Sequence, residues 1–221
     1  MPTPRKPSRA KTPAQTLEHR IEKRSARLAV IGLGYVGLPL AVELAQAGFE
    51  VHGIDIDAKR VAQLNKGVSY IQDVPTADVR TLVKQKRFFA TTDFSVLRKC
   101  DTVNICVPTP LSKQRDPDVS YIVAAATEVA RHLHRGQLVI LESTTYPGTT
   151  DELVLPMLAE SGLEVGKDFF LAFSLFRLAA IVQGVYKRGL DGNASSETAK
   201  NYGDRARVLA ELGWSMVERH A

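Results

Sequence analysis

The sequence predicts an α/β fold built on a doubly wound parallel sheet of six strands. Six short apolar runs alternate with amphipathic segments of helix length between residues 27 and 174. The runs are mainly apolar, without the regular polar alternation of a strand that has one face in water, so we expect helices on both faces of the sheet. Six such strands joined by right-handed crossovers suit the Rossmann order 3-2-1-4-5-6.

Each element follows from its local pattern. The apolar runs predict strands at 28–31, 51–54, 88–91, 102–107, 138–141 and 169–173. The amphipathic segments predict helices at 37–47, 58–65, 76–86, 94–98, 120–134 and 150–161. Gly48 stands where the first of these helices needs a left-handed cap. Thr149 and Glu152 have the spacing of a capping box that opens the last helix.

Length and composition exclude several classes of protein. The 221 residues allow one large domain, or one domain and a fragment. Apolar residues make up 44% and charged residues 24% of the chain, which excludes a wholly disordered protein. No apolar run reaches the roughly 18 residues of a membrane-spanning helix. The two cysteines are too few to staple a fold of this size, so we interpret them as reduced thiols of a cytoplasmic protein.

The positive charge belongs to the N-terminal tail. The chain carries a net charge of +5, but residues 1–27 hold eight Lys/Arg against two Glu, which leaves 21 basic and 22 acidic residues beyond them. We predict a disordered basic tail over 1–26, with a short helix over 14–23 as the one element it could form. A solvated extension is favoured, with no nucleic-acid or membrane partner, although an anionic partner and a mitochondrial transit peptide stay open.

A glycine-rich turn follows the first predicted strand. Gly32, Gly34 and Gly37 form a G-x-G-x-x-G pattern between the strand at 28–31 and a helix rich in Leu, Ala and Val. Gly32 permits a tight turn, Gly34 lets a pyrophosphate approach the backbone, and Gly37 lets the helix pack close to the strand. The free N–H groups at the helix start favour phosphate. The alternative is a glycine turn of purely structural use.

An acidic residue ends the second predicted strand. Asp55 lies 23 residues after Gly32, where a carboxylate accepts hydrogen bonds from both ribose hydroxyls of NAD and repels the 2′-phosphate of NADP. Arg60 complicates this choice, because a nearby arginine can accommodate NADP. With Asp55 in place, we predict NAD as the cofactor.

Other chemistry-bearing residues have structural interpretations. Residues 162–168 imitate a phosphate-binding loop but have the wrong spacing, so we interpret them as a turn. His132 and His134 lie two apart on a predicted helix and point to different faces, so no metal site is expected. Cys100 and Cys106 flank or lie inside a predicted strand, where cysteine is usually a small apolar residue.

Residues 27–174 resemble the N-terminal NAD-binding domain of the UDP-glucose/GDP-mannose dehydrogenase family, with most likeness to bacterial UDP-N-acetylglucosamine and UDP-glucose 6-dehydrogenases. The stretches that carry the resemblance are 32–41, 53–57, 107–110, 116–122, 142–150 and 168–174. The resemblance implies an NAD-dependent oxidation of a sugar C6 alcohol to a carboxylate through two hydride transfers.

The same resemblance implies roles for single residues. Tyr35 and Val36 would hold the pyrophosphate together with the glycine turn, and Asp55 and Arg60 would lie on the adenosine side. The resemblance also implies two threonines at the cofactor. Thr109 would lie beside it, and Thr144 would help to position a catalytic water, although Thr144 could equally be a strand-end hydroxyl that caps a turn.

The sequence departs from the family after Ser174. There the family continues with Pro-Glu and a substrate region that supplies a lysine, an asparagine and the nucleophilic cysteine, whereas this chain continues with Leu-Phe-Arg-Leu. We therefore expect a domain that binds NAD but is inactive alone, without the UDP-sugar site and the oligomerisation domain of the full-length family. A pure NAD-binding module and the product of a chimeric or truncated gene are the alternatives.

The last part of the chain resembles another family. Residues 171–221 are similar to the C-terminus of aminoglycoside-phosphotransferase-like kinases, without the catalytic motifs of those kinases. We expect amphipathic helices at 175–186 and 204–218, which form a helical extension of different origin over 175–221.

Overall fold

The computed structural model describes residues 11–110, 118–143, 145, 148–173 and 207. The chain divides into two compact units, Met1–Ala172 and Phe173–Ala221. The helices expected at 175–186 and 204–218, apart from Arg207, and nearly all of the kinase-like segment lie outside the described residues. All elements below belong to the first unit, apart from the final residue of its last strand.

Six strands form one sheet in the order β3-β2-β1-β4-β5-β6, which confirms the predicted order. The pairs β1–β2, β1–β4, β2–β3 and β4–β5 are parallel. The strands are β1 (Arg27–Ile31), β2 (Glu50–Ile54), β3 (Phe88–Thr91), β4 (Thr102–Ile105), β5 (Leu138–Leu141) and β6 (Phe170–Phe173). Only the strand expected at 102–107 is clearly shorter than predicted. β4 ends at Ile105, although Cys106 still donates its N–H to the Ile31 carbonyl at 2.8 Å, and Pro108, which has no N–H, could not continue the ladder.

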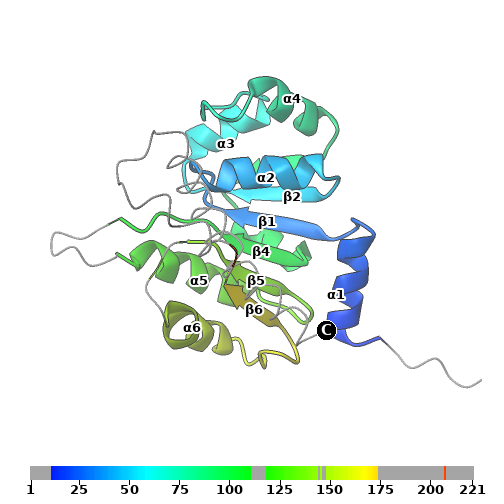
Figure 1. Ribbon diagram of the computed structural model, residues 1–221. Coiled ribbons are helices and arrows are strands. Elements are labelled where there is room, and N and C mark those ends of the chain that lie inside the picture. Colours follow the sequence, from blue (N-terminus) through cyan, green and yellow to red (C-terminus); the bar gives the residue numbers. More distant parts are fainter. Residues whose placement is uncertain (1–10, 111–117, 144, 146–147, 174–206, 208–221) are drawn as a thin grey trace, which may run out of the picture. The chain divides into compact units, whose positions relative to one another are not determined.

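Helices cover both faces of the sheet (Figure 1). On one face lie α2 (Gly37–Gln46), α3 (Ala58–Asn65) and α4 (Thr76–Lys84). On the other lie the 3-10 helix η1 (Phe94–Lys99), α5 (Ser120–His132), the π-helix η2 (Thr149–Val154) and α6 (Leu155–Ala159). Successive side chains of a strand point to opposite faces, and accordingly Leu28 and Val30 join the core under α2 whereas Ala29 and Ile31 join the core under α5. The continuous apolar runs in the sequence are explained by these two cores.

Helix ends agree with the sequence in one place and differ in another. Gly48 follows α2 with a φ of +100°, which confirms the predicted left-handed cap. The capping box at Thr149 and Glu152 is wrong, because Thr149 is already the first residue of η2 and Gly148, with a φ of +97°, is the N-cap. Glu152 instead turns back onto this glycine, and its backbone N–H donates to the Gly148 carbonyl at 2.7 Å.

The N-terminal segment contains a helix that lies within one residue, at each end, of the short helix expected at 14–23, so the expectation of disorder is wrong for residues 12–26. Helix α1 (Pro13–Glu22) begins with a capping box between Thr12 and Gln15, and Leu17 on it is buried. Disorder was expected because the segment has few apolar residues, and composition takes no account of contacts with distant parts of the chain. The helix is held instead by contacts with distant parts of the chain.

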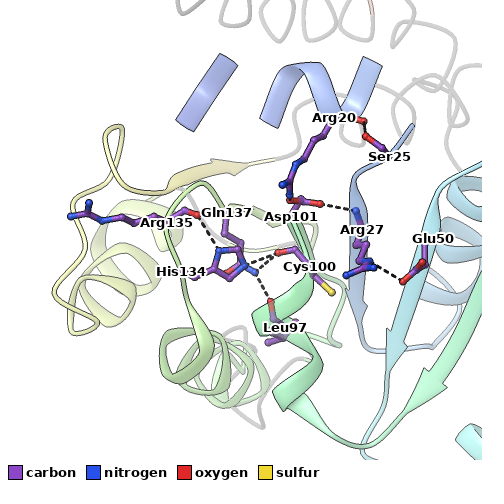
Figure 2. A network of polar contacts seen from close by, with 10 residues as sticks. All are labelled: Arg20, Ser25, Arg27, Glu50, Leu97, Cys100, Asp101, His134, Arg135 and Gln137. Carbon is purple, nitrogen blue, oxygen red and sulfur yellow. Dashed lines mark hydrogen bonds and ion pairs between the residues drawn. The ribbon is translucent and has the colours of Figure 1, made fainter. Parts of the chain in front are cut away.

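Figure 2 shows the contacts that hold α1 at the amino ends of the strands. Arg20 of α1 forms an ion pair with the buried carboxylate of Asp101, which precedes β4. The other oxygen of Asp101 accepts from the backbone N–H of Arg27 at 2.8 Å, so one carboxylate joins α1, β1 and β4. Beside it, the buried amide of Gln137 donates to the carbonyls of Leu97 and Cys100. This end of the sheet is therefore occupied by structural contacts.

Candidate dinucleotide site

The glycine turn joins the carboxyl end of β1 to the start of α2, and the backbone around it explains two of its three glycines. Gly32 has a φ of +89°, and a Cβ there would lie 2.7 Å from the carbonyl oxygen of Cys106. A Cβ on Gly37 would lie 1.7 Å from the carbonyl oxygen of Gly32. Both positions exclude a side chain through contacts within the protein, as a purely structural turn would.

Gly34 has no such explanation. A Cβ at this position would meet nothing within 4 Å, and its φ lies outside the left-handed region that favours glycine. The fold therefore tolerates a side chain where the sequence has none. An absent Cβ beside open space is what close approach of a ligand to the backbone requires, so Gly34 favours phosphate binding over the structural alternative.

The start of α2 provides positive potential next to this space. Its N-cap residue, Val36, makes no side-chain capping hydrogen bond. The first N–H groups of a helix have no intrahelical partners, and the helix dipole adds partial positive charge to them. Within the first turn of this ten-residue helix, Leu38 already donates its N–H to the Gly34 carbonyl at 3.1 Å and Pro39 has no N–H, so the donors left for a phosphate are those of Gly37 and of the glycine turn itself.

Asp55 lies directly after β2 and is bonded to the glycine turn. Its Oδ2 accepts from the backbone N–H of Leu33 at 2.9 Å, and its Oδ1 accepts from the backbone N–H of Asp57 at 2.9 Å. Only 7% of the residue is exposed. A carboxylate has about four acceptor sites, so each oxygen retains the capacity to accept from one ribose hydroxyl. The structure thus brings together the two motifs that the sequence singled out.

Arg60 lies against carboxylates. Its Nη1 is 4.0 Å from Oδ2 of Asp55, and its Nε is 3.5 Å from Oδ2 of Asp57. Its guanidinium carbon lies 5.5 Å from the centre of the Tyr70 ring. Two negative charges therefore compensate the guanidinium, which leaves little net positive potential for a 2′-phosphate. This arrangement favours NAD over NADP.

Two further residues of the site carry no signal strong enough to identify them from sequence. Tyr70, in the connection between α3 and α4, donates its hydroxyl to the Leu33 carbonyl at 2.7 Å. Burial, together with the negative charge of Asp55, raises the pKa of Tyr70 to about 12. Ile56, next to Asp55, is 80% exposed, as is Tyr35. Together with the half-exposed Val36, these apolar side chains offer surface that an aromatic ring of a ligand would cover.

Of the two threonines expected at the cofactor, Thr109 is among the described residues and Thr144 is not. Thr109 is half-buried on the segment after β4, and the start of this segment, at Cys106 and Val107, contacts the glycine turn. Thr144 lies outside the described residues. Its neighbour Ser143 is buried and donates to the carbonyl of Val107 at 2.8 Å, so the ends of β4 and β5 are joined beside the turn.

The remaining candidates have structural roles. Cys100 is fully buried, and burial raises the pKa of its thiol to about 12, so it is a poor nucleophile; Cys106 is 7% exposed. The sequence predicted both His132 and His134 on a helix. In the structure His132 is the last residue of α5, and His134 lies beyond that helix.

Among the described residues no cluster of His, Cys, Asp or Glu could hold a metal ion. In the same part of the chain, no helix has the length and apolar character needed to cross a membrane.

Comparison with known proteins agrees with this geometry. Residues 26–176 match the UDP-glucose/GDP-mannose dehydrogenase family, NAD binding domain. UDP-N-acetyl-D-glucosamine 6-dehydrogenase of Pseudomonas aeruginosa is 38% identical over 156 residues, which are 70% of this chain and 36% of that protein. UDP-N-acetyl-D-mannosamine dehydrogenase of Pyrococcus horikoshii is 36% identical over 178 residues, which are 78% of this chain and 42% of that protein.

The solved structures give the same result. A ternary complex of GDP-mannose dehydrogenase from Pseudomonas aeruginosa superposes with a TM-score of 0.62 at 33% identity, and the match covers 66% of this chain and 35% of that one. A UDP-D-ManNAc dehydrogenase from Pyrococcus horikoshii has a TM-score of 0.63 at 38% identity, with 66% and 35% covered. The chain therefore spans 36% and 42% of the length of the two curated relatives above.

Proposed function

Because this chain belongs to the UDP-glucose/GDP-mannose dehydrogenase family through its NAD-binding domain, we propose that it supplies the cofactor site of a nucleotide-sugar 6-dehydrogenase. The bound nicotinamide would accept the hydride that leaves the sugar C6 carbon. The residues described here bind and orient the dinucleotide. The glycine turn and the start of α2 receive the pyrophosphate, and Asp55 receives the adenosine ribose.

The proposal rests on the open space at Gly34. The residue before it, Leu33, is hydrogen-bonded to the carboxylate of Asp55. The Leu33 N–H donates to Asp55 at 2.9 Å, so the acidic group and the turn are held together before any ligand arrives. A site held in this way binds its ligand without first having to order the turn. Charge compensation at Arg60 supports NAD, rather than NADP, as that ligand.

The substrate class comes from the relatives. The two curated relatives described above act, by their names, on UDP-N-acetyl-D-glucosamine and UDP-N-acetyl-D-mannosamine. We therefore propose a UDP-linked hexose or N-acetylhexosamine as the substrate of the whole enzyme. A cytoplasmic location is part of the same proposal, since such a location keeps two thiols reduced.

We propose that the 221-residue polypeptide binds NAD but does not oxidise UDP-sugars by itself. Oxidation of an aldehyde to an acid through a thioester needs an accessible thiolate. The sequence has two cysteines, and both are buried in the NAD-binding domain. Cys100 is fully buried and only 7% of Cys106 is exposed, so neither residue presents an accessible thiolate in the folded domain.

Calorimetric titration with NAD and NADP tests the binding proposal. We expect saturable binding of NAD and binding of NADP weaker by at least about tenfold, because its 2′-phosphate would meet Asp55 and Asp57. Absence of NAD binding, or a preference for NADP, would contradict the proposal. A second assay mixes the protein with NAD and UDP-sugars and records NADH absorbance, and turnover there would contradict the statement on the two cysteines.

A further inference from the structure

The connection between α3 and α4 reaches across to the glycine turn through one side chain. The Tyr70 hydroxyl donates to the Leu33 carbonyl at 2.7 Å, and the two residues are 37 positions apart. The half-buried ring packs against the core that includes α2, α3 and α4. This contact is not needed to form either helix. We therefore ask how it affects the conformation of the glycine turn.

The backbone N–H, the carbonyl and the side chain of Leu33 are all fixed by contacts. Asp55 accepts from its N–H, Tyr70 donates to its carbonyl, and its side chain is fully buried. The buried side chain lies so close to Gly53 of β2 that a Cβ there would be 2.8 Å from Leu33 Cδ2. With both neighbouring peptide groups directed in this way, the turn has little freedom to rotate about Leu33.

The Leu33 carbonyl belongs to the same peptide unit as the N–H of Gly34. A peptide is planar and trans, so its carbonyl and its N–H point in opposite directions, and a contact that orients one orients the other. Tyr70 therefore controls the direction of the Gly34 N–H, although it does not touch this group. Gly34 is the glycine beside the open space described above.

Tyr70 is itself held in place before any ligand binds. Ser69 donates its backbone N–H to Oγ1 of Thr76 at 3.1 Å, which ties the connection to the start of α4. The guanidinium of Arg60 lies 5.5 Å from the ring centre. Because the pKa of Tyr70 is raised to about 12, its hydroxyl keeps the proton that it donates throughout the pH range of binding assays.

We infer that Tyr70 is a positioning residue for the dinucleotide: its hydroxyl holds the Leu33–Gly34 peptide so that the Gly34 N–H is directed at the pyrophosphate. The inference rests on the proposed NAD site and adds a residue from outside the glycine motif to it. It predicts that loss of one hydroxyl, at a position that does not contact the ligand's phosphates, weakens binding by reducing the fraction of molecules with the turn in its binding-competent form.

Tyr70→Phe tests the inference because it removes the hydroxyl and keeps the ring near Arg60. We expect the Kd for NAD and for ADP-ribose to rise by about three- to tenfold. In ¹⁵N-labelled protein without ligand, the Gly34 amide resonance should shift and exchange faster with solvent. The matched control is Ser161→Ala, which removes a hydroxyl bonded to the Leu158 carbonyl at 2.6 Å after α6. This control should leave the Kd and the Gly34 resonance unchanged.

Rescue separates positioning from loss of stability. Replacement of Tyr70 by 4-aminophenylalanine restores a donor and should return the Kd to within about twofold of the original, whereas 4-fluorophenylalanine, of similar size, should not. This pair also serves if the phenylalanine variant does not fold. Unchanged Kd and an unshifted Gly34 amide in Tyr70→Phe would overturn the inference. If the unmodified protein does not bind NAD, the proposed function fails, and the Gly34 amide in the ligand-free variants still decides whether Tyr70 directs this peptide.

Discussion

Substitution of Gly34 by alanine separates cofactor binding from folding. In the ligand-free protein the new methyl group would meet nothing within 4 Å, and the φ of Gly34 is not in the left-handed region. An alanine in a compatible conformation restricts the unfolded chain and stabilises by about 0.4–1 kcal/mol. For a chain of this size we expect the Tm to rise by roughly 1–4 °C.

The effect on NAD has the opposite sign. A phosphate oxygen that accepts from a backbone N–H lies about 2.9 Å from the nitrogen, whereas a methyl carbon keeps other heavy atoms at roughly 3.5 Å or more. The methyl group that Gly34→Ala introduces would therefore displace the pyrophosphate and remove a hydrogen bond to a charged group. Such a bond contributes about 1.5–3 kcal/mol, which corresponds to a rise in Kd of roughly tenfold to 150-fold.

Thermal unfolding followed by circular dichroism and calorimetric titration with NAD measure the two effects on the same sample. Gly37→Ala provides the contrast, since its Cβ would lie 1.7 Å from the Gly32 carbonyl oxygen and the turn would have to rearrange. We expect that variant to lose both stability and binding. The reasoning is refuted if folded Gly34→Ala binds NAD as tightly as the original chain, or if its Tm falls as far as that of Gly37→Ala.

Three other substitutions probe the rest of the domain. Asp101→Asn should destabilise the protein by about 1–3 kcal/mol in urea unfolding, because the ion pair to α1 is lost at a buried site; an NAD affinity that fell with it would contradict the placement of these contacts at the opposite end of the sheet. Burial raises the pKa of Cys100 from an ordinary 9.0 to about 12, so the stability that it contributes is complete below pH 9 and is lost as pH rises toward 12. The fall in Tm above pH 9 should therefore be smaller in Cys100→Ala, and an identical fall in both proteins would count against this assignment. Asp57→Ala removes the N-cap of α3 and one of the charges beside Arg60, so it should cost about 1 kcal/mol and raise the affinity for NADP relative to NAD, as titrations with both dinucleotides would reveal.

Local pattern was sufficient for the sheet and for the motif residues. An apolar run of four or five residues between two helices has to bury both faces, and only a parallel sheet between helix layers does so. The layered parallel sheet follows from that requirement, and its strand order follows from the right-handed crossovers and the Rossmann pattern of the glycine turn. The glycine turn and Asp55 could be identified for a related reason, because they stand at the carboxyl ends of adjacent strands, where the topology brings them together.

Other features depend on contacts between residues far apart in the chain. Tyr70 meets the Leu33 carbonyl across 37 positions, and Arg20 meets Asp101 across 81. Neither contact has a periodicity or a spacing that a reader of the sequence could count. The same applies to Gly34, whose open surroundings distinguish it from Gly32 and Gly37 although all three belong to one motif.

The positions of the strands and the chemistry of the turn were thus encoded in neighbouring residues, because the apolar character of short segments and the freedom of glycine are local properties. Which charges lie beside Arg60, which hydroxyl donates to the turn, and which contacts hold α1 against the sheet became known once the chain was folded. Each of these depends on distances between groups that the unfolded chain does not hold together, and the energy of a hydrogen bond or an ion pair is set by those distances.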